Sequence, residues 1–128
     1  MRAGKLKLCI ATLMGRSTGN PIAHVDFVSP AQTFGMARSH LAYYRALEHL
    51  GLVTLITDAP QLDQFLDTLT DDSSKIGFVI SMESADAILN PGQVGEWYDL
   101  GVRLIGPAHY GMGRYAGGTG VEEGLTEI

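Results

Sequence analysis

The stretch Lys75-Ile-Gly-Phe-Val-Ile-Ser-Met-Glu83 decides the expected fold, because an apolar, strand-like run leads directly into a carboxylate. The run lacks alternating polarity, which is typical of strands that are covered on both faces. A carboxylate at the end of such a strand is costly unless it is solvated, paired or bound to a metal. In proteins built from strand–helix units, active-site groups gather where the strands end. Glu83 is therefore either a solvated loop residue or a ligand.

Three further apolar runs have the same character, and helical patterns alternate with them. The four predicted strands cover residues 6–14, 52–57, 76–82 and 102–106. Apolar residues at spacings of three and four predict helices over residues 30–50, 58–69 and 90–100, and a polar loop is expected over residues 71–75. Strands that alternate with helices indicate a parallel sheet. The predicted fold class is therefore α/β, with a parallel βα series.

Capping residues mark the ends of the predicted helices. Ser29 is the expected N-cap of the first helix, and Gly51 is its expected stop. Either Thr57 or Asp58 is expected to cap the second helix, and Asn90 opens a capping signature for the third.

Composition and charge exclude several classes of protein. The 128 residues are enough for one domain with a core, so a single domain over residues 1–128 is expected. The formal charge of -5 and the lack of a Lys/Arg cluster argue against nucleic acid as a partner. Because Cys9 is the only cysteine, an intrachain disulfide is excluded, which favours a reducing, cytoplasmic location. No stretch approaches the roughly 18 apolar residues of a membrane span.

The ends of the chain and one long connection are unusual for a self-contained domain. The first 14 residues have the charge pattern of a targeting signal, but the apolar run is short and no clear cleavage site follows, so we expect a strand. Residues 15–29 form a long connection without periodicity, and residues 124–128 resemble the start of a helix. These features predict that the chain is a piece of something larger.

A glycine-rich loop follows the last predicted strand and carries His109. Glycine occupies six of the fifteen positions in residues 106–120, which on glycine content alone is equally typical of a flexible surface loop. No Lys followed by Ser or Thr is present, so the loop is not a P-loop. His109 and Glu83 each follow a strand, and the ends of parallel strands meet at one rim. A Glu and a His on one rim suit a divalent metal with an activated water, although a single His after a strand is more often a structural hydrogen-bonding residue.

Five other residues have chemically active side chains. His24-Val-Asp26 has the spacing of a metal-binding pair, but it lies in the irregular connection, where a solvated loop with Asp26 organising the turn is the simpler interpretation. His40 and His49 fall in the first predicted helix, where a surface role is expected. Cys9 lies within a predicted strand and is expected to be an inert core residue.

An ordered series of motifs resembles the membrane dipeptidase (renal dipeptidase) family of zinc peptidases, most strongly its bacterial branch. The matching stretches are Phe78-Val-Ile-Ser-Met-Glu-Ser-Ala-Asp-Ala-Ile88, Trp97-Tyr-Asp-Leu-Gly-Val-Arg-Leu-Ile-Gly106, His109-Tyr-Gly-Met-Gly-Arg-Tyr-Ala-Gly-Gly-Thr-Gly120 and Gly124-Leu-Thr126. The resemblance implies a (β/α)8 barrel, of which this chain holds about the second to fourth strands. It also implies two zinc ions at the C-terminal rim, bridged by a water that attacks the dipeptide bond.

The resemblance assigns roles to two residues. Glu83 matches the carboxylate that bridges the two zinc ions, which makes it a predicted metal ligand and catalytic residue. His109 matches the histidine that contacts the substrate near the scissile carbonyl, which makes it a predicted substrate-binding residue. The family's metal-binding His-x-Asp lies upstream of anything in this chain, so His24 and Asp26 do not correspond to it. Ser84 stands where many members of the family have glycine.

Three hypotheses for function follow. The first is a fragment of a zinc dipeptidase that is inactive alone, because it carries only one of the family's metal ligands. The second is a non-catalytic remnant or binding module. The third is an amidohydrolase-like metal hydrolase of another substrate class, with His24 and Asp26 in a rearranged site. The expected partners are a dipeptide substrate and either further copies of the chain or the remainder of the barrel, since unpaired apolar edge strands invite association.

Overall fold

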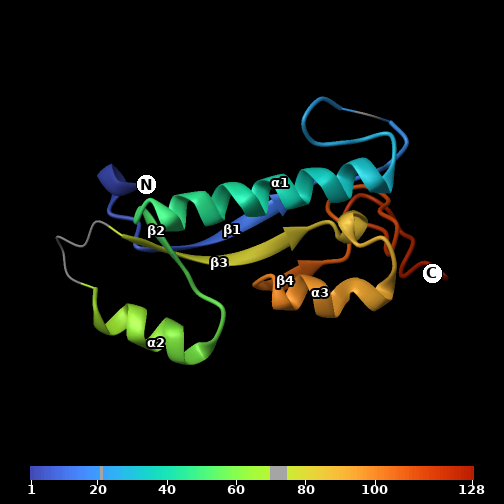
Figure 1. Ribbon diagram of the computed structural model, residues 1–128. Coiled ribbons are helices and arrows are strands. Elements are labelled where there is room, and N and C mark those ends of the chain that lie inside the picture. The colour runs from blue at the N-terminus through green and yellow to red at the C-terminus, as the bar shows by residue number, and fades with distance from the viewer. Residues whose placement is uncertain (21, 70–74) are drawn as a thin grey trace.

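The computed structural model describes residues 1–20, 22–69 and 75–128. These residues form a four-stranded sheet, three α-helices and three short 3-10 turns (Figure 1). The strands are β1 Leu8–Met14, β2 Val53–Leu55, β3 Ile76–Glu83 and β4 Val102–Gly106. The helices are α1 Pro30–His49, α2 Ala59–Asp67 and α3 Val94–Asp99, and the turns are η1 Arg2–Gly4, η2 Ala85–Ala87 and η3 Pro91–Gln93. Residues 71–74 of the predicted polar loop lie outside the described residues.

Strand β3 is the centre of the sheet. One edge of β3 pairs with β1 along its length, from Leu8 opposite Gly77 to Met14 opposite Glu83. Its other edge is shared, because β2 pairs with the first residues of β3 and β4 pairs with the last. All three pairings are parallel, which confirms the predicted α/β class. This alternation of parallel strands and helices is consistent with part of a TIM-barrel-like fold.

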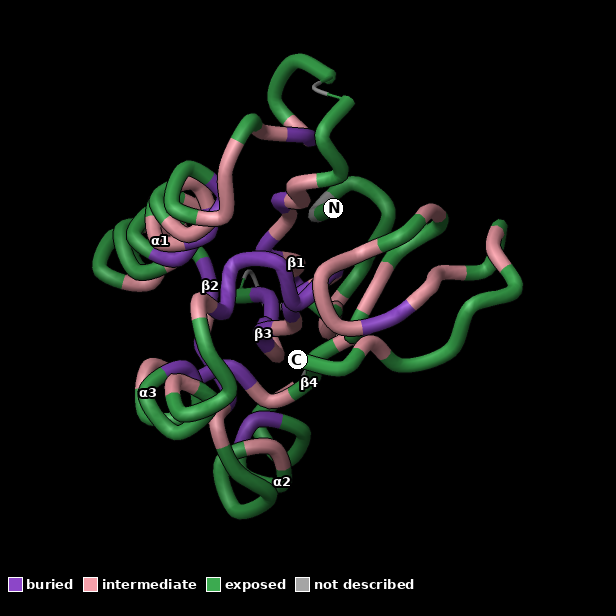
Figure 2. The backbone as a smooth tube through the Cα atoms, turned by 90° about the vertical axis from the view of Figure 1, so that its right-hand side faces the viewer, coloured by how far each residue is buried: buried purple, intermediate pink, exposed green. Residues whose placement is uncertain are grey.

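The core lies between the sheet and the helices. Figure 2 shows α1 and α3 on one side of the strands and the C-terminal segment on the other. Alternate side chains of β3 are buried on the helix side, and they are Ile76, Phe78, Ile80 and Met82. Trp97 of α3 is fully buried and makes an edge contact with the ring of Phe34, at 5.6 Å between ring centroids. This apolar layer fixes both helices against β3.

The opposite face of the sheet carries a different set of side chains. Glu83 and Ser81 belong to the alternate row of β3, which faces away from the core. The Ser81 hydroxyl lies 3.1 Å from the hydroxyl of Thr12 on β1. Ile10 of β1 is 59% exposed and Leu104 of β4 is 46% exposed. Glu83 therefore ends a row that leaves the apolar core and reaches an open face.

The observed helix ends agree with most of the capping predictions. Ser29 caps α1 by accepting a hydrogen bond from the Gln32 N–H, and α1 is followed by Gly51 at a φ of 68°. Asp58, and not Thr57, caps α2. The prediction for the third helix was wrong in detail, because Asn90 makes no side-chain capping bond. A 3-10 turn comes first, and α3 begins only at Val94.

The segment at residues 124–128 also differs from its prediction. These residues are not helical. Leu125 instead forms an antiparallel bridge with Ala116, and the Thr126 N–H donates to the Tyr115 carbonyl at 3.0 Å. The backbone bonds that a first helical turn would need are therefore used in pairing with the preceding loop. Among the described residues, no helix has the length and apolar character needed to cross a membrane.

Candidate functional site

The structure brings the two predicted site residues into contact. Glu83 is the last residue of β3, and His109 follows the end of β4 by three residues. The His109 Nδ1 lies 2.6 Å from the Glu83 Oε1, and the two side chains are 43% and 42% exposed. The expectation that both residues lie at one rim of the sheet is thus confirmed. Their assignment to metal and substrate remains a prediction.

The chain turns sharply directly after Glu83. Ser84 has a φ of 82°, a conformation that residues other than glycine rarely adopt. Its side chain is buried, and its Oγ has no hydrogen-bond partner among the described residues. The turn leads into η2, and the Ala85 N–H donates to the Pro107 carbonyl at 3.3 Å. Ser84 therefore carries both backbone strain and an unpaired hydroxyl at the end of the site strand.

Backbone hydrogen bonds within the loop that carries His109 hold its two halves together. The Thr119 N–H donates to the His109 carbonyl at 3.3 Å, and the Gly120 N–H donates to the Tyr110 carbonyl at 2.7 Å. Gly118 lies so close that a Cβ there would overlap the His109 carbonyl oxygen. The glycines are needed because two backbone segments approach each other closely.

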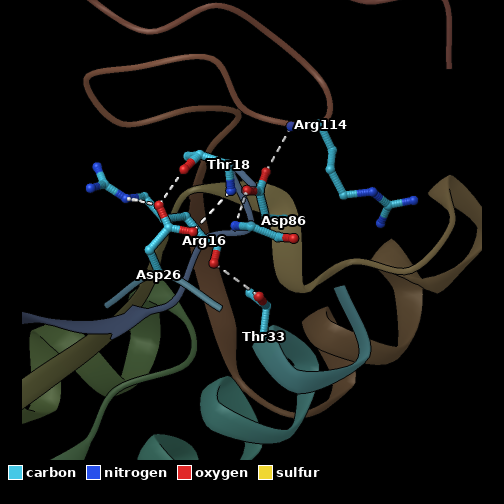
Figure 3. A network of polar contacts seen from close by, with 7 residues as sticks. Arg16, Thr18, Asp26, Thr33, Asp86 and Arg114 are labelled. Carbon is cyan, nitrogen blue, oxygen red and sulfur yellow. Dashed lines mark hydrogen bonds and ion pairs between the residues drawn. The ribbon is translucent and has the colours of Figure 1, made fainter. Parts of the chain in front are cut away.

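Sequence reasoning missed the buried Asp86. This residue of η2 is fully buried, and its carboxylate accepts from the N–H groups of Ser17 at 2.7 Å and Arg114 at 2.8 Å (Figure 3). It thus ties the segment after β1 and the loop after β4 to the turn after β3. A polar residue three positions after Glu83, between alanines, was the available signal, but its partners are far away in the sequence.

Asp26 is the second buried carboxylate of this region. It is 3% exposed and accepts from the Arg16 Nε at 3.2 Å, the Thr18 N–H at 2.9 Å and the Thr18 hydroxyl. Thr33 of α1 donates to the Arg16 carbonyl at 3.1 Å (Figure 3). The expected organising role of Asp26 is confirmed, whereas its expected solvation is wrong. His24 is exposed and has a φ of 68°.

Burial raises the pKa of Asp26, but the hydrogen bonds from Thr18 and the charge of Arg16 outweigh burial. The net effect is a pKa below the ordinary value of an aspartate. The carboxylate is therefore ionised and occupied by partners from its own segment. Because Arg16 and Thr18 already occupy the carboxylate, a rearranged metal site built on His24 and Asp26 is disfavoured.

The remaining histidines and the cysteine have structural positions. The Nδ1 of His40 accepts from the Met14 N–H at 3.2 Å, so this half-buried residue holds the end of β1 and is not confined to the helix surface. His49 is exposed at the end of α1, as expected. Cys9 packs beside the core, and burial raises the pKa of its thiol, which agrees with an inert residue.

The described residues do not complete a zinc site. No group of three or more His, Cys, Asp or Glu side chains that could hold a metal ion is found in residues 1–20, 22–69 and 75–128. Catalytic zinc ordinarily has three protein ligands and one water. Glu83 and His109 supply two suitable side chains at most. The described residues could therefore provide only some of the ligands of a metal centre.

Comparison with known proteins supports the fold. No family model matches the sequence, and no curated protein matches it. Among solved structures, the chain is similar to a crystal structure described as the metallopeptidase dipeptidase AC, with a TM-score of 0.59 and 19% sequence identity. The match covers 94% of this chain and 37% of that chain. The chain therefore spans little more than a third of the dipeptidase, and at this identity the likeness shows a shared fold alone.

Replacing Ser84 with glycine is expected to stabilise the protein. The change removes a backbone strain of about 1–3 kcal/mol and an unpaired buried hydroxyl, against a glycine entropy cost of about 0.5–1 kcal/mol. Urea unfolding should show a gain of about 1 kcal/mol in the free energy of unfolding. Ser39→Gly in α1 is the control and should lose about 0.3–1 kcal/mol, since Ser39 has helical geometry. A loss with Ser84→Gly would contradict the strain argument.

The lowered pKa of Asp26 predicts how stability depends on pH. A carboxylate with a depressed pKa contributes stability above its unfolded pKa of about 3.9, and the contribution is lost as the pH falls through the folded value. Asp26→Asn should therefore destabilise the protein at about pH 6, by roughly 1–3 kcal/mol, and much less at about pH 2–3. Urea unfolding at both pH values measures the difference. Asp63→Asn, on the exposed surface of α2, should have little effect at either pH.

Proposed function

We propose that this chain carries part of the active site of a metal-dependent dipeptidase, with Glu83 as a metal ligand and His109 as a substrate-binding residue. The observation that carries this proposal is the contact of 2.6 Å between the two side chains, at the ends of neighbouring parallel strands. The rim at the carboxyl ends of such strands is where catalytic residues of barrel enzymes lie. The resemblance of the Glu83 and His109 motifs to zinc dipeptidases supports the same assignment.

The geometry suits these two roles. Glu83 is close to half exposed, so its carboxylate is open to a cation as well as to His109. Because the His109 Nδ1 faces Glu83, Nε2 is the ring nitrogen that remains free to form a hydrogen bond with a substrate. The proposed substrate is a dipeptide, and the proposed cofactor is zinc, with two ions in the complete site.

For the chain by itself, the small number of metal ligands favours a second candidate function, which is a non-catalytic remnant or binding module. Since the described residues offer no third ligand, the remaining ligands would have to come from elsewhere in the complete barrel. A non-catalytic chain would bind zinc weakly and hydrolyse nothing. Both candidates therefore predict weak metal binding by these residues. They differ only in whether the complete barrel would hydrolyse a dipeptide.

A zinc titration by calorimetry tests the proposed role of Glu83. The parent chain should bind Zn²⁺ weakly, and Glu83→Gln should reduce the affinity at least tenfold, because an amide is a poor zinc ligand. Glu122→Gln, at an exposed site, and His24→Ala should leave the affinity unchanged. An affinity that is unaffected by Glu83→Gln would overturn the proposal. Tight binding that is lost with His24→Ala would instead support the rearranged site.

We also propose that the chain associates with further copies of itself. The open face of the sheet exposes Ile10 and Leu104, and exposed apolar surface on strands favours association. Sedimentation velocity should show dimers or larger species, and the double variant Ile10→Thr/Leu104→Thr should shift them toward monomer. Leu66→Thr on α2, also exposed, is the control and should not. A monomeric parent chain at all concentrations would contradict the proposal.

A further inference from the structure

Asp86 joins three segments that end at the candidate site. Its Oδ2 accepts from the Ser17 N–H, in the segment that follows β1, and its Oδ1 accepts from the Arg114 N–H, in the loop that follows β4. Asp86 itself lies three residues after Glu83, in the turn that follows β3. In Figure 3 its carboxylate lies between the two loops that it binds. A fully buried carboxylate with two backbone donors is held firmly and holds its donors in turn.

The same turn holds the loop of His109 on both sides of that residue. Before His109, the Pro107 carbonyl accepts from the Ala85 N–H. After it, the Arg114 guanidinium donates to the Ile88 carbonyl at 2.7 Å, next to the bond from the Arg114 N–H to Asp86. The turn that begins at Glu83 is therefore also the platform on which His109 is placed.

We propose that Asp86 is a positioning residue, which sets the placement of His109 against Glu83. Both Asp86 carboxylate oxygens accept hydrogen bonds, and both partners are backbone N–H groups, which can only donate. An asparagine has the same shape but presents an NH2 group to one of the two donors, so one of the loops must move. The relevance of this placement to substrate binding rests on the proposed function, whereas the placement itself does not.

Asp26 provides a matched control. It is also buried and also accepts from a backbone N–H, so Asp26→Asn should destabilise the protein much as Asp86→Asn does. All of the hydrogen-bond partners of its carboxylate, however, lie at Arg16 and Thr18, in its own segment. Of the two aspartates, only Asp86 contacts the loop of His109 through its side chain. A role in positioning and a general role in stability therefore predict different results for the two variants.

The experiment is ring-nitrogen NMR of the metal-free full chain at about pH 8.5, where imidazoles are ordinarily neutral. A neutral His109 that donates from Nδ1 to Glu83 adopts the Nδ1–H tautomer, whereas Glu83→Gln should return it to the usual Nε2–H tautomer. His109→Gln identifies the signals. Asp86→Asn should likewise give the Nε2–H tautomer of His109. Asp26→Asn should keep the Nδ1–H tautomer of the parent chain. Both aspartate variants should lower the Tm.

A second pair of variants decides the matter if Asp86→Asn does not fold. A Cβ at Gly113 would lie 3.1 Å from the Asp86 Oδ1, whereas a Cβ at Gly111 meets nothing within 4 Å. Gly113→Ala should shift His109 toward the Nε2–H tautomer, and Gly111→Ala should not. An unchanged tautomer in Asp86→Asn or, where that variant does not fold, in Gly113→Ala would overturn the inference, as would an equal change in Asp26→Asn. Because no metal or dipeptide is present, a failed zinc titration would leave this result standing.

Discussion

The pairing of β3 with every other strand is the constraint on which the rest of the structure depends. β1 occupies one edge of β3, and β2 and β4 divide the other edge between them. The buried row of β3 provides much of the apolar surface on which α1 and α3 pack. Glu83 ends the same strand, so the residue of chemical interest is fixed by the most highly connected element of the sheet.

Polar contacts join the loops at the site end of the sheet, in addition to the apolar packing of Ala85, Ala87 and Ile88. Asp26 organises the segment after β1, and Asp86 connects that segment to the loop after β4. Buried carboxylates are costly unless their acceptor positions are satisfied, which makes such networks sensitive to a single substitution. The strained Ser84 lies between this network and Glu83, so the site combines strain with firm anchoring, as functional sites often do.

The described residues define the fold more completely than they define a catalytic site. A parallel sheet with α1 and α3 on one face is complete enough to define the class of fold. The described residues contribute one carboxylate and one imidazole in contact, which is fewer than a catalytic zinc requires. The proposed dipeptidase site would thus need further ligands from outside the described residues.

The sequence by itself determined the alternation of strands and helices, the cap at Ser29 and the placement of Glu83 and His109 after successive strands. These features depend on neighbouring residues, so periodicity and spacing carry them. Only the tertiary structure decided that β2 and β4 share one edge of β3, that two segments of the glycine-rich loop pair with each other, and that Asp86 joins two loops. The partners of Asp86 lie 69 and 28 residues away in the sequence, and such contacts leave no local pattern. Burial of a single aspartate arises from the packing of distant segments, which no spacing along the chain can show.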